Sequence, residues 1–147
     1  MTASIHHIRP VFESPTLKDA DSLDPCECYA KLASRRVGRV VSFDGALPVI
    51  TPARYAVNGS DVYVSIGTHR EGHGHLGGTV VALEVDDLDP RSGRGWAVTV
   101  TGVAEPCMHP SRWPLVVRLG LVVFDAGWPS VFRLPVEIVS GRRIAAI

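Results

Sequence analysis

Several features are scarce in this sequence of 147 residues, and each absence narrows what the chain can be. No apolar run approaches the roughly 20 residues that a membrane-spanning helix needs. The first residues, which include His6 and Arg9, carry no apolar stretch of the kind found in a signal peptide. The cysteines number only three, and an odd count argues against a disulfide framework and for a reducing compartment. We therefore expect a cytoplasmic protein that has no membrane partner.

Net charge is also absent, because 15 basic residues balance 15 acidic ones. Nothing in that balance points to nucleic acid or to an anionic membrane as a partner. Lysine is rare: only Lys18 and Lys31 are lysines, and the other basic residues are arginines. The planar guanidinium of arginine suits fixed recognition of carboxylate or phosphate. A hydrophobic content of 46% indicates a globular chain, and the length leaves room for one domain with one core.

A clear helix start follows an N-terminal segment, residues 1–22, that has no sustained periodicity and is predicted to be an extended arm. Asp24 is placed as the N-cap, Pro25 stands at the first helical position, and Glu27 occupies the acidic position of a capping box. The spacing of Leu23 and Cys28 fits a hydrophobic staple. The helix is expected to run towards Arg36 and to stop at Gly38.

The remainder of the chain has the pattern of β-strands joined by hairpins. Asp44-Gly45 and Asn58-Gly59 are strong hairpin turn signals. Residues 109–128 predict one or two short helices. Trp113, Phe124 and Trp128 are expected to cover a barrel end or a dimer interface, and the apolar stretch Leu115 to Phe124 favours dimerisation. Six strands are expected, over residues 39–43, 48–57, 61–65, 79–85, 95–105 and 131–139. Together with the leading helix they predict a mainly β fold, an antiparallel closed or split barrel.

Several short motifs occur together in one order. They are Leu23, Glu27 and Cys28 on the helix, Gly38-Arg39, Pro48-Val49, Pro52 to Val57, Glu84-Val85-Asp86, Gly95 to Gly102 and Gly141 to Ile144. With this ordered set the chain resembles the FMN-binding split barrels of the pyridoxamine 5′-phosphate oxidase-like superfamily, over about residues 23–144. The resemblance implies a six-stranded antiparallel split β-barrel over residues 23–147.

The resemblance also implies a homodimer that holds two equivalent flavin sites between its protomers. The expected activity is that of an oxidoreductase that uses FMN, or alternatively a deazaflavin, and acts on a small-molecule substrate. The family pattern assigns one set of residues to the phosphate and another to the flavin ring or its rim. The first set is Ser65, Thr68, His69 and Arg70, and the second is Arg54, Tyr55, Ala56 and Trp96.

One departure from the family pattern concerns the phosphate. Family members that hold FMN usually carry Phe-Arg-Thr at the end of the third strand, where this chain has Tyr63-Val64-Ser65. Val64 removes an arginine, at a cost of about 1.5–3 kcal/mol for one charge-assisted contact. Arg54 stands where the family often has asparagine, so it could reach the same anion from the neighbouring strand.

The alternative function is a dimeric barrel that binds flavin or haem without turnover, or that binds no ligand.

Three other clusters resemble metal sites. His69, His73 and His75 have a spacing that could bind zinc, copper or haem iron, but the surrounding glycines leave that loop too flexible to preorganise a site, so no metal is expected. Cys26 and Cys28 point to nearly opposite sides of a helix and should not chelate one ion. The acidic run from Asp86 to Asp89 lacks the glycine and the terminal glutamate of a calcium loop and is predicted to be a solvated turn.

Overall fold

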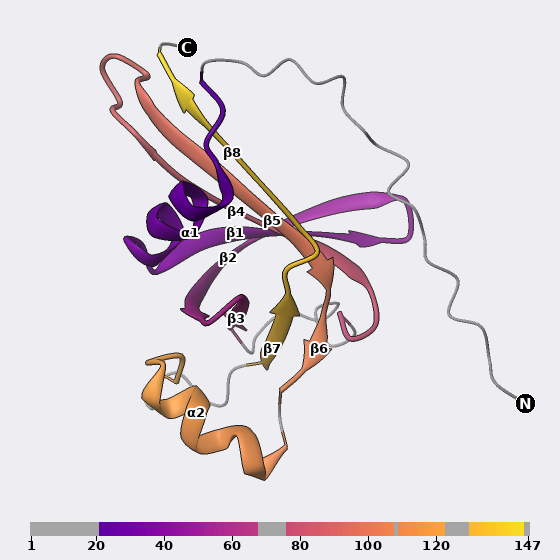
Figure 1. Ribbon diagram of the computed structural model, residues 1–147. Coiled ribbons are helices and arrows are strands. Elements are labelled where there is room, and N and C mark those ends of the chain that lie inside the picture. Colours follow the sequence, from indigo (N-terminus) through magenta and orange to yellow (C-terminus); the bar gives the residue numbers. More distant parts are fainter. Residues whose placement is uncertain (1–20, 68–75, 108, 123–129, 146–147) are drawn as a thin grey trace, which may run out of the picture.

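The computed structural model describes residues 21–67, 76–107, 109–122 and 130–145. Its centre is one antiparallel sheet of eight strands, in the order β6-β7-β3-β2-β1-β4-β5-β8, which curls into a half-barrel (Figure 1). The strands are β1 Val37–Asp44, β2 Leu47–Asn58, β3 Asp61–Ile66, β4 Val80–Leu88, β5 Gly95–Val103, β6 Glu105–Pro106, β7 Ser130–Pro135 and β8 Ile138–Ile144. The helices are α1 Pro25–Ala33, the 3-10 helix η1 Pro110–Arg112 and α2 Trp113–Arg118. The mainly β, antiparallel split-barrel prediction is confirmed.

The structure has eight strands where six were expected. The single strand expected over residues 131–139 is two strands, because the chain turns after Pro135 and changes its partner. β7 pairs with β3, whereas β8 pairs with β5 on the other side of the sheet. The second addition is β6, which Ala104 separates from β5 and which pairs with β7.

Helix α1 begins as its sequence predicts and ends earlier. Asp24 Oδ1 accepts a hydrogen bond from the Glu27 backbone N–H at 2.8 Å, and Glu27 Oε2 accepts one from the Asp24 N–H at 2.9 Å, so the capping box is formed. The helix stops at Ala33 rather than near Arg36, and Ser34 Oγ donates to the Lys31 carbonyl at 2.6 Å. The Arg36 carbonyl already accepts from the Tyr55 N–H at 2.9 Å, which shows that the sheet begins there.

The inner face of the curled sheet and one side of α1 share the main core. Cys28 and Leu32 of α1 are buried in the same cluster as Tyr55, Val98 and Val100. Cys28 is therefore a core residue.

A second cluster lies under α2. Val116 and Leu121 pack with Tyr63 of β3 and Val131 of β7. The described part of the apolar stretch from Leu115 therefore covers the sheet of its own chain, and residues 123–124 lie outside the described residues.

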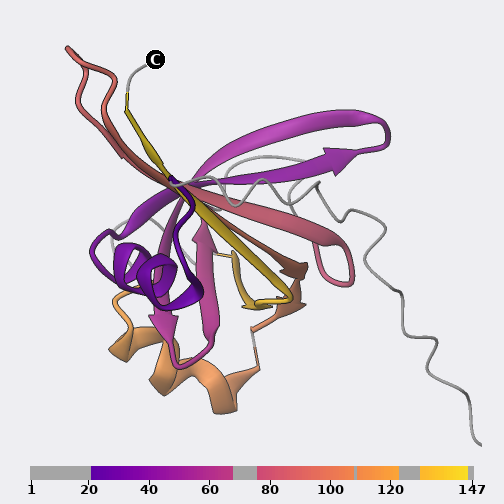
Figure 2. The same ribbon diagram turned by 45° about the horizontal axis from the view of Figure 1, so that its top comes forward.

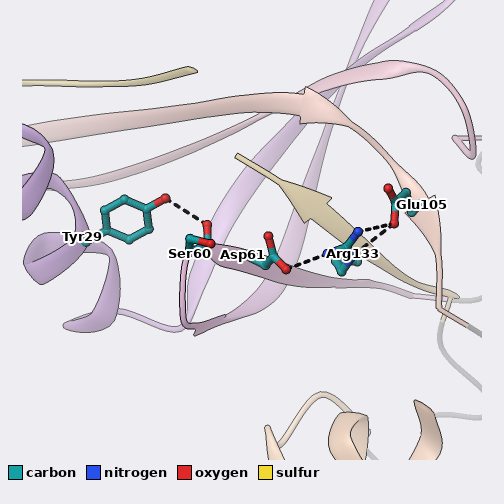
Figure 3. Close-up of polar contacts among 5 residues, drawn as sticks. All are labelled: Tyr29, Ser60, Asp61, Glu105 and Arg133. Atoms are coloured by element: carbon teal, nitrogen blue, oxygen red, sulfur yellow. Dashed lines mark hydrogen bonds and ion pairs between the residues drawn. The ribbon is translucent and has the colours of Figure 1, made fainter. Parts of the chain in front are cut away.

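Three polar contacts join neighbouring strands to one another and α1 to the β2–β3 turn (Figure 3). Arg133 of β7 binds the Asp61 carboxylate of β3 at 2.7 Å and the Glu105 carboxylate of β6 at 2.7 Å, so one guanidinium links three neighbouring strands. Tyr29 Oη of α1 donates to the Ser60 carbonyl in the β2–β3 turn at 2.9 Å.

In the described part of the chain, neither α1 nor α2 is long and apolar enough to cross a bilayer.

Candidate functional site

A surface cavity of about 300 Å³ lies where the C-terminal part of β2 meets the ends of α1 and α2. Arginine is its dominant polar residue. Arg35 and Arg36 follow α1, Arg54 lies on β2, and Arg118 ends α2. The rest of the described lining is mostly apolar and includes Ala56, Leu119 and Leu121. Three elements that are distant in the sequence therefore bring four guanidinium groups to one hollow.

Among the described residues, only one of these four arginines has an acidic partner. Arg35 forms an ion pair with Asp87 of β4. Within the described ranges, no acidic side chain pairs with Arg36, Arg54 or Arg118. Guanidinium groups that converge without acidic partners bind carboxylates and phosphates through charge-assisted hydrogen bonds. The cavity is therefore suited to an anionic group.

Tyr55 forms a fixed, neutral wall of the cavity. Its hydroxyl donates to the Leu32 carbonyl of α1 at 2.6 Å, and its side chain is 2% exposed. Burial raises the pKa of Tyr55 to about 12, although the nearby Arg35 charge acts in the opposite direction. The phenol consequently stays protonated at neutral pH and supports the wall of the cavity, rather than exchanging a proton with a ligand.

The turn after α2 completes the cavity, and the sequence analysis did not place it there. Gly120 has a φ of 71°, the left-handed conformation that often ends a helix. Its N–H donates to the Val117 carbonyl at 3.0 Å, and Leu121 then enters the second core cluster. An arginine in the last helical turn followed by Leu119-Gly120 is a helix-end signal that could have located this edge of the site.

The structure brings some of the predicted site residues together and leaves others apart. Arg54, Tyr55 and Ala56 line the cavity, and Ser65 is the register neighbour of Arg54 on β3, 7% exposed. Trp96 lies on β5 in the main core, 5.5 Å below the Lys31 ammonium, and does not line the cavity. The predictions for Thr68, His69 and Arg70, and for the histidine cluster 69–75, fall outside the described residues.

The other suspected metal ligands do not converge. Cys26 is exposed whereas Cys28 is buried, as expected of residues on opposite sides of a helix. The solvated turn predicted for Asp86 to Asp89 is wrong for its first part, because Asp86 and Asp87 lie in β4 and pair with Arg39 and Arg35. The turn begins at Asp89, whose Oδ1 accepts from the N–H groups of Arg91 and Ser92 at 2.7 and 2.8 Å. Across the described residues, no three His, Cys, Asp or Glu side chains gather as a metal site.

The curled antiparallel sheet and the arginine-lined cavity beside β2 define a class of protein, a split barrel with an arginine-lined hollow. The family model described as pyridoxamine 5′-phosphate oxidase matches residues 24–143, so the chain belongs to that family.

Known proteins agree with this assignment. An uncharacterised protein of Mycobacterium tuberculosis is 35% identical over 137 residues, which cover 88% of each chain. The FAD binding protein from Mycobacterium smegmatis has a similar structure, with a TM-score of 0.69, 24% identity and coverage of 85% of this chain and 98% of its own. The FAD and Heme binding protein from the same organism is similar at a TM-score of 0.67, with 13% identity and coverage of 84% and 73%. Identities this low between the structures show a shared fold.

Proposed function

We propose that the protein is a flavin-dependent oxidoreductase of the cytoplasm that acts on a small molecule, and that the arginine cavity holds the phosphate of its flavin. The observation that carries this proposal is the position of the cavity. It lies on the β2 segment that the family resemblance assigned to the flavin ring or its rim, where Arg54 was expected to be able to reach the phosphate as well. It is lined by Arg36, Arg54 and Arg118 without acidic partners among the described residues. FMN is the proposed cofactor, with a deazaflavin as the alternative, because both carry a phosphate group.

The residues present fit the charged end of such a cofactor. Guanidinium N–H groups match phosphate oxygens in geometry and charge. The cavity volume of about 300 Å³ lies at the lower end of the range for small-molecule sites, so it suits a part of the cofactor, such as the phosphate and the adjoining chain. Arg54 would then supply a cation that the family usually places at the position of Val64.

The residues that line the cavity indicate what the protein and the flavin would each contribute. The bound flavin would supply the redox chemistry. Arg36, Arg54 and Arg118 would bind and orient its phosphate, and the neutral Tyr55 would keep the wall of the cavity rigid. The apolar side chains of Leu119 and Leu121 would limit the access of water to these ion pairs, which strengthens them.

A second candidate function is binding without turnover, to flavin or to haem. Two observations favour it: the valine at position 64 in place of an arginine, and the similarity in fold to a protein described as binding FAD and haem. The absorbance spectrum of the purified protein separates the candidates. A two-band flavin spectrum that bleaches and recovers with a reductant and a substrate supports the oxidoreductase, whereas a Soret band supports haem binding.

The test of the cavity is a fluorescence titration of the cofactor-free protein with FMN. Both Arg54→Gln and Arg118→Gln should weaken binding by about tenfold or more, because each removes one charge-assisted contact. Arg91→Gln, in the exposed β4–β5 turn outside the cavity, is the matched control and should bind as the unaltered protein does. Equal FMN affinity in all four proteins would show that the phosphate binds elsewhere.

A further inference from the structure

Arg35 differs from the other three arginines of the cavity because a carboxylate holds its side chain. Its guanidinium Nη2 pairs with Oδ2 of Asp87. In the described ranges, Arg36, Arg54 and Arg118 have no such acidic partner. Asp87 belongs to β4 and is not among the residues that line the cavity. The pair therefore joins an arginine of the cavity to a carboxylate outside it.

The packing of α1 brings the two partners together. Helix α1 lies at the foot of the β4–β5 hairpin, which projects from the sheet (Figures 1 and 2). The ammonium group of Lys31, in the last turn of α1, lies 5.5 Å from the centre of the Trp96 ring, and Trp96 is the register partner of Asp87. The chain then leaves the helix, and the Arg35 N–H donates to the Leu32 carbonyl at 3.3 Å. The side chain that follows α1 therefore reaches the end of β4.

The backbone around Arg35 is fixed, whereas its side chain is exposed enough to change partner. The Leu32 carbonyl also accepts from the Tyr55 hydroxyl at 2.6 Å, and the Arg36 carbonyl accepts from the Tyr55 N–H at 2.9 Å. The side chains of Arg35 and Asp87 are 46% and 47% exposed. An ion pair this exposed is weak, because water and salt screen it. An anion in the cavity can therefore compete with Asp87 for the guanidinium.

The charge of Arg35 acts at the wall of the cavity as well as at Asp87. Burial raises the pKa of Tyr55, and the Arg35 charge opposes this rise. Tyr55 is part of the cavity lining, so a group bound beside it lies within the field of the same guanidinium. Arg35 is thus placed between the Asp87 carboxylate on one side and the cavity on the other.

The balance of charge indicates which anion the cavity favours. A phosphate monoester carries a charge of about −1.5 to −2 at neutral pH, which the guanidinium groups of Arg36, Arg54 and Arg118 already balance. A fourth free guanidinium would favour a ligand with more charge and more acceptor oxygens, such as a diphosphate. The pairing of Arg35 with Asp87 offsets that fourth charge. The cavity is therefore matched to one phosphate group.

We propose that Asp87 is a specificity-determining residue, which restricts the cavity to a single phosphate group by holding Arg35. This inference rests on the proposed function, in which the cavity holds the phosphate of a flavin, and it adds a preference for a monophosphate over a diphosphate ligand. Asp87 acts as a positioning residue, since it influences the ligand through the Arg35 side chain.

The test compares inorganic phosphate with inorganic pyrophosphate, by calorimetric titration of the cofactor-free protein at fixed pH and ionic strength. Asp87→Asn should raise the affinity for pyrophosphate by about fivefold, because it releases Arg35 from a weak pair, and should change the affinity for phosphate by less than about twofold. Asp87→Glu keeps a carboxylate and should retain the affinity ratio of the unaltered protein. Asp89→Asn is the matched control. It removes the same charge in the adjoining turn, where asparagine can still accept from the N–H groups of Arg91 and Ser92, and it should leave both affinities unchanged.

A double variant shows whether Asp87 acts through Arg35. In an Arg35→Gln background, Asp87→Asn should leave the affinity ratio unchanged, because no guanidinium remains to be released. An increase of the same size in that background would show that the carboxylate acts by its charge alone, and would overturn the proposal. An unchanged ratio in Asp87→Asn itself, or no measurable binding of either anion to the unaltered protein, would overturn it as well. A purely structural ion pair would instead lower the free energy of unfolding by urea in Asp87→Asn and leave the ratio as it was.

The two proposals fail in different ways, because neither of these probes contains a flavin. If the pyrophosphate ratio rises as expected and FMN does not bind, only the flavin function is refuted. If Arg54→Gln weakens FMN binding and the ratio in Asp87→Asn is unchanged, only the role of Asp87 is refuted.

Discussion

Tyr55 shows how one buried residue couples the core to the cavity. It is an inward-facing residue of β2, and its hydroxyl crosses to the Leu32 carbonyl at the end of α1. The same residue is part of the cavity lining, between Arg54 and Ala56. A change at Tyr55 should therefore affect both stability and ligand binding. The ionisation of its phenol makes the effect on stability depend on pH, so that effect can be measured by itself.

The unaltered protein should lose stability at high pH through the ionisation of Tyr55, and Tyr55→Phe should not show this loss. The pKa of Tyr55 in the folded protein is about 12, above its ordinary value of 10, so the folded state favours the neutral phenol. This contribution is complete below about pH 10 and is lost as the pH rises towards 12. The free energy of unfolding by urea should thus fall more steeply over that range in the unaltered protein than in Tyr55→Phe. Parallel curves for the two proteins would contradict the prediction.

Helix α1 is held at its start by local hydrogen bonds, which the sequence alone could predict. Asp24→Ala removes the side-chain acceptor for the Glu27 N–H and should lower the free energy of unfolding by about 1 kcal/mol. Asp24→Asn keeps an acceptor and should stay close to the unaltered protein. Chemical denaturation at neutral pH measures both, and an equal loss in the two variants would show that the charge matters rather than the cap.

At the level of elements, local signals were sufficient where a turn or a cap decides the structure. The capping box of Asp24 and Glu27 and the two hairpin turns at Gly45 and Gly59 lie where the sequence places them. The signals were insufficient for the C-terminal strands. Residues 131–139 have a continuous β pattern, and only the different partners of β7 and β8 divide them, because strand pairing is a contact between distant segments.

For the whole molecule, curling of the sheet depends on a close backbone approach between β5 and β7. A Cβ atom at Gly102 would collide with the Pro135 carbonyl oxygen. Gly102→Ala should therefore destabilise the protein by about 1–3 kcal/mol, as overpacking of a fixed contact does. Gly67→Ala is the matched control, because a Cβ atom there meets no neighbouring atom within 4 Å. Equal thermal midpoints of the two variants would show that the β5–β7 contact can relax.

The candidate site also shows that the sequence does not predict contacts between distant segments. Arg54, Tyr55 and Ala56 form a contiguous motif in the sequence, and the structure places all three at the cavity. Arg36 and Arg118 carried no signal that linked them to β2, because they reach the cavity only after α1 ends early and α2 packs on β3 and β7. Trp96 belonged to a motif in the family pattern, yet its side chain takes part in the main core.

The amino-acid sequence by itself determined the strands up to β5, the start of the leading helix, the family and the arginine-rich chemistry of the chain. These depend on local backbone preference, on the alternation of apolar residues and on composition, which act within a few residues. Tertiary structure alone decided which arginines share a cavity and which apolar residues remain exposed on the sheet. Both depend on how segments more than 80 residues apart pack together, since burial and the summation of charge are properties of that packing.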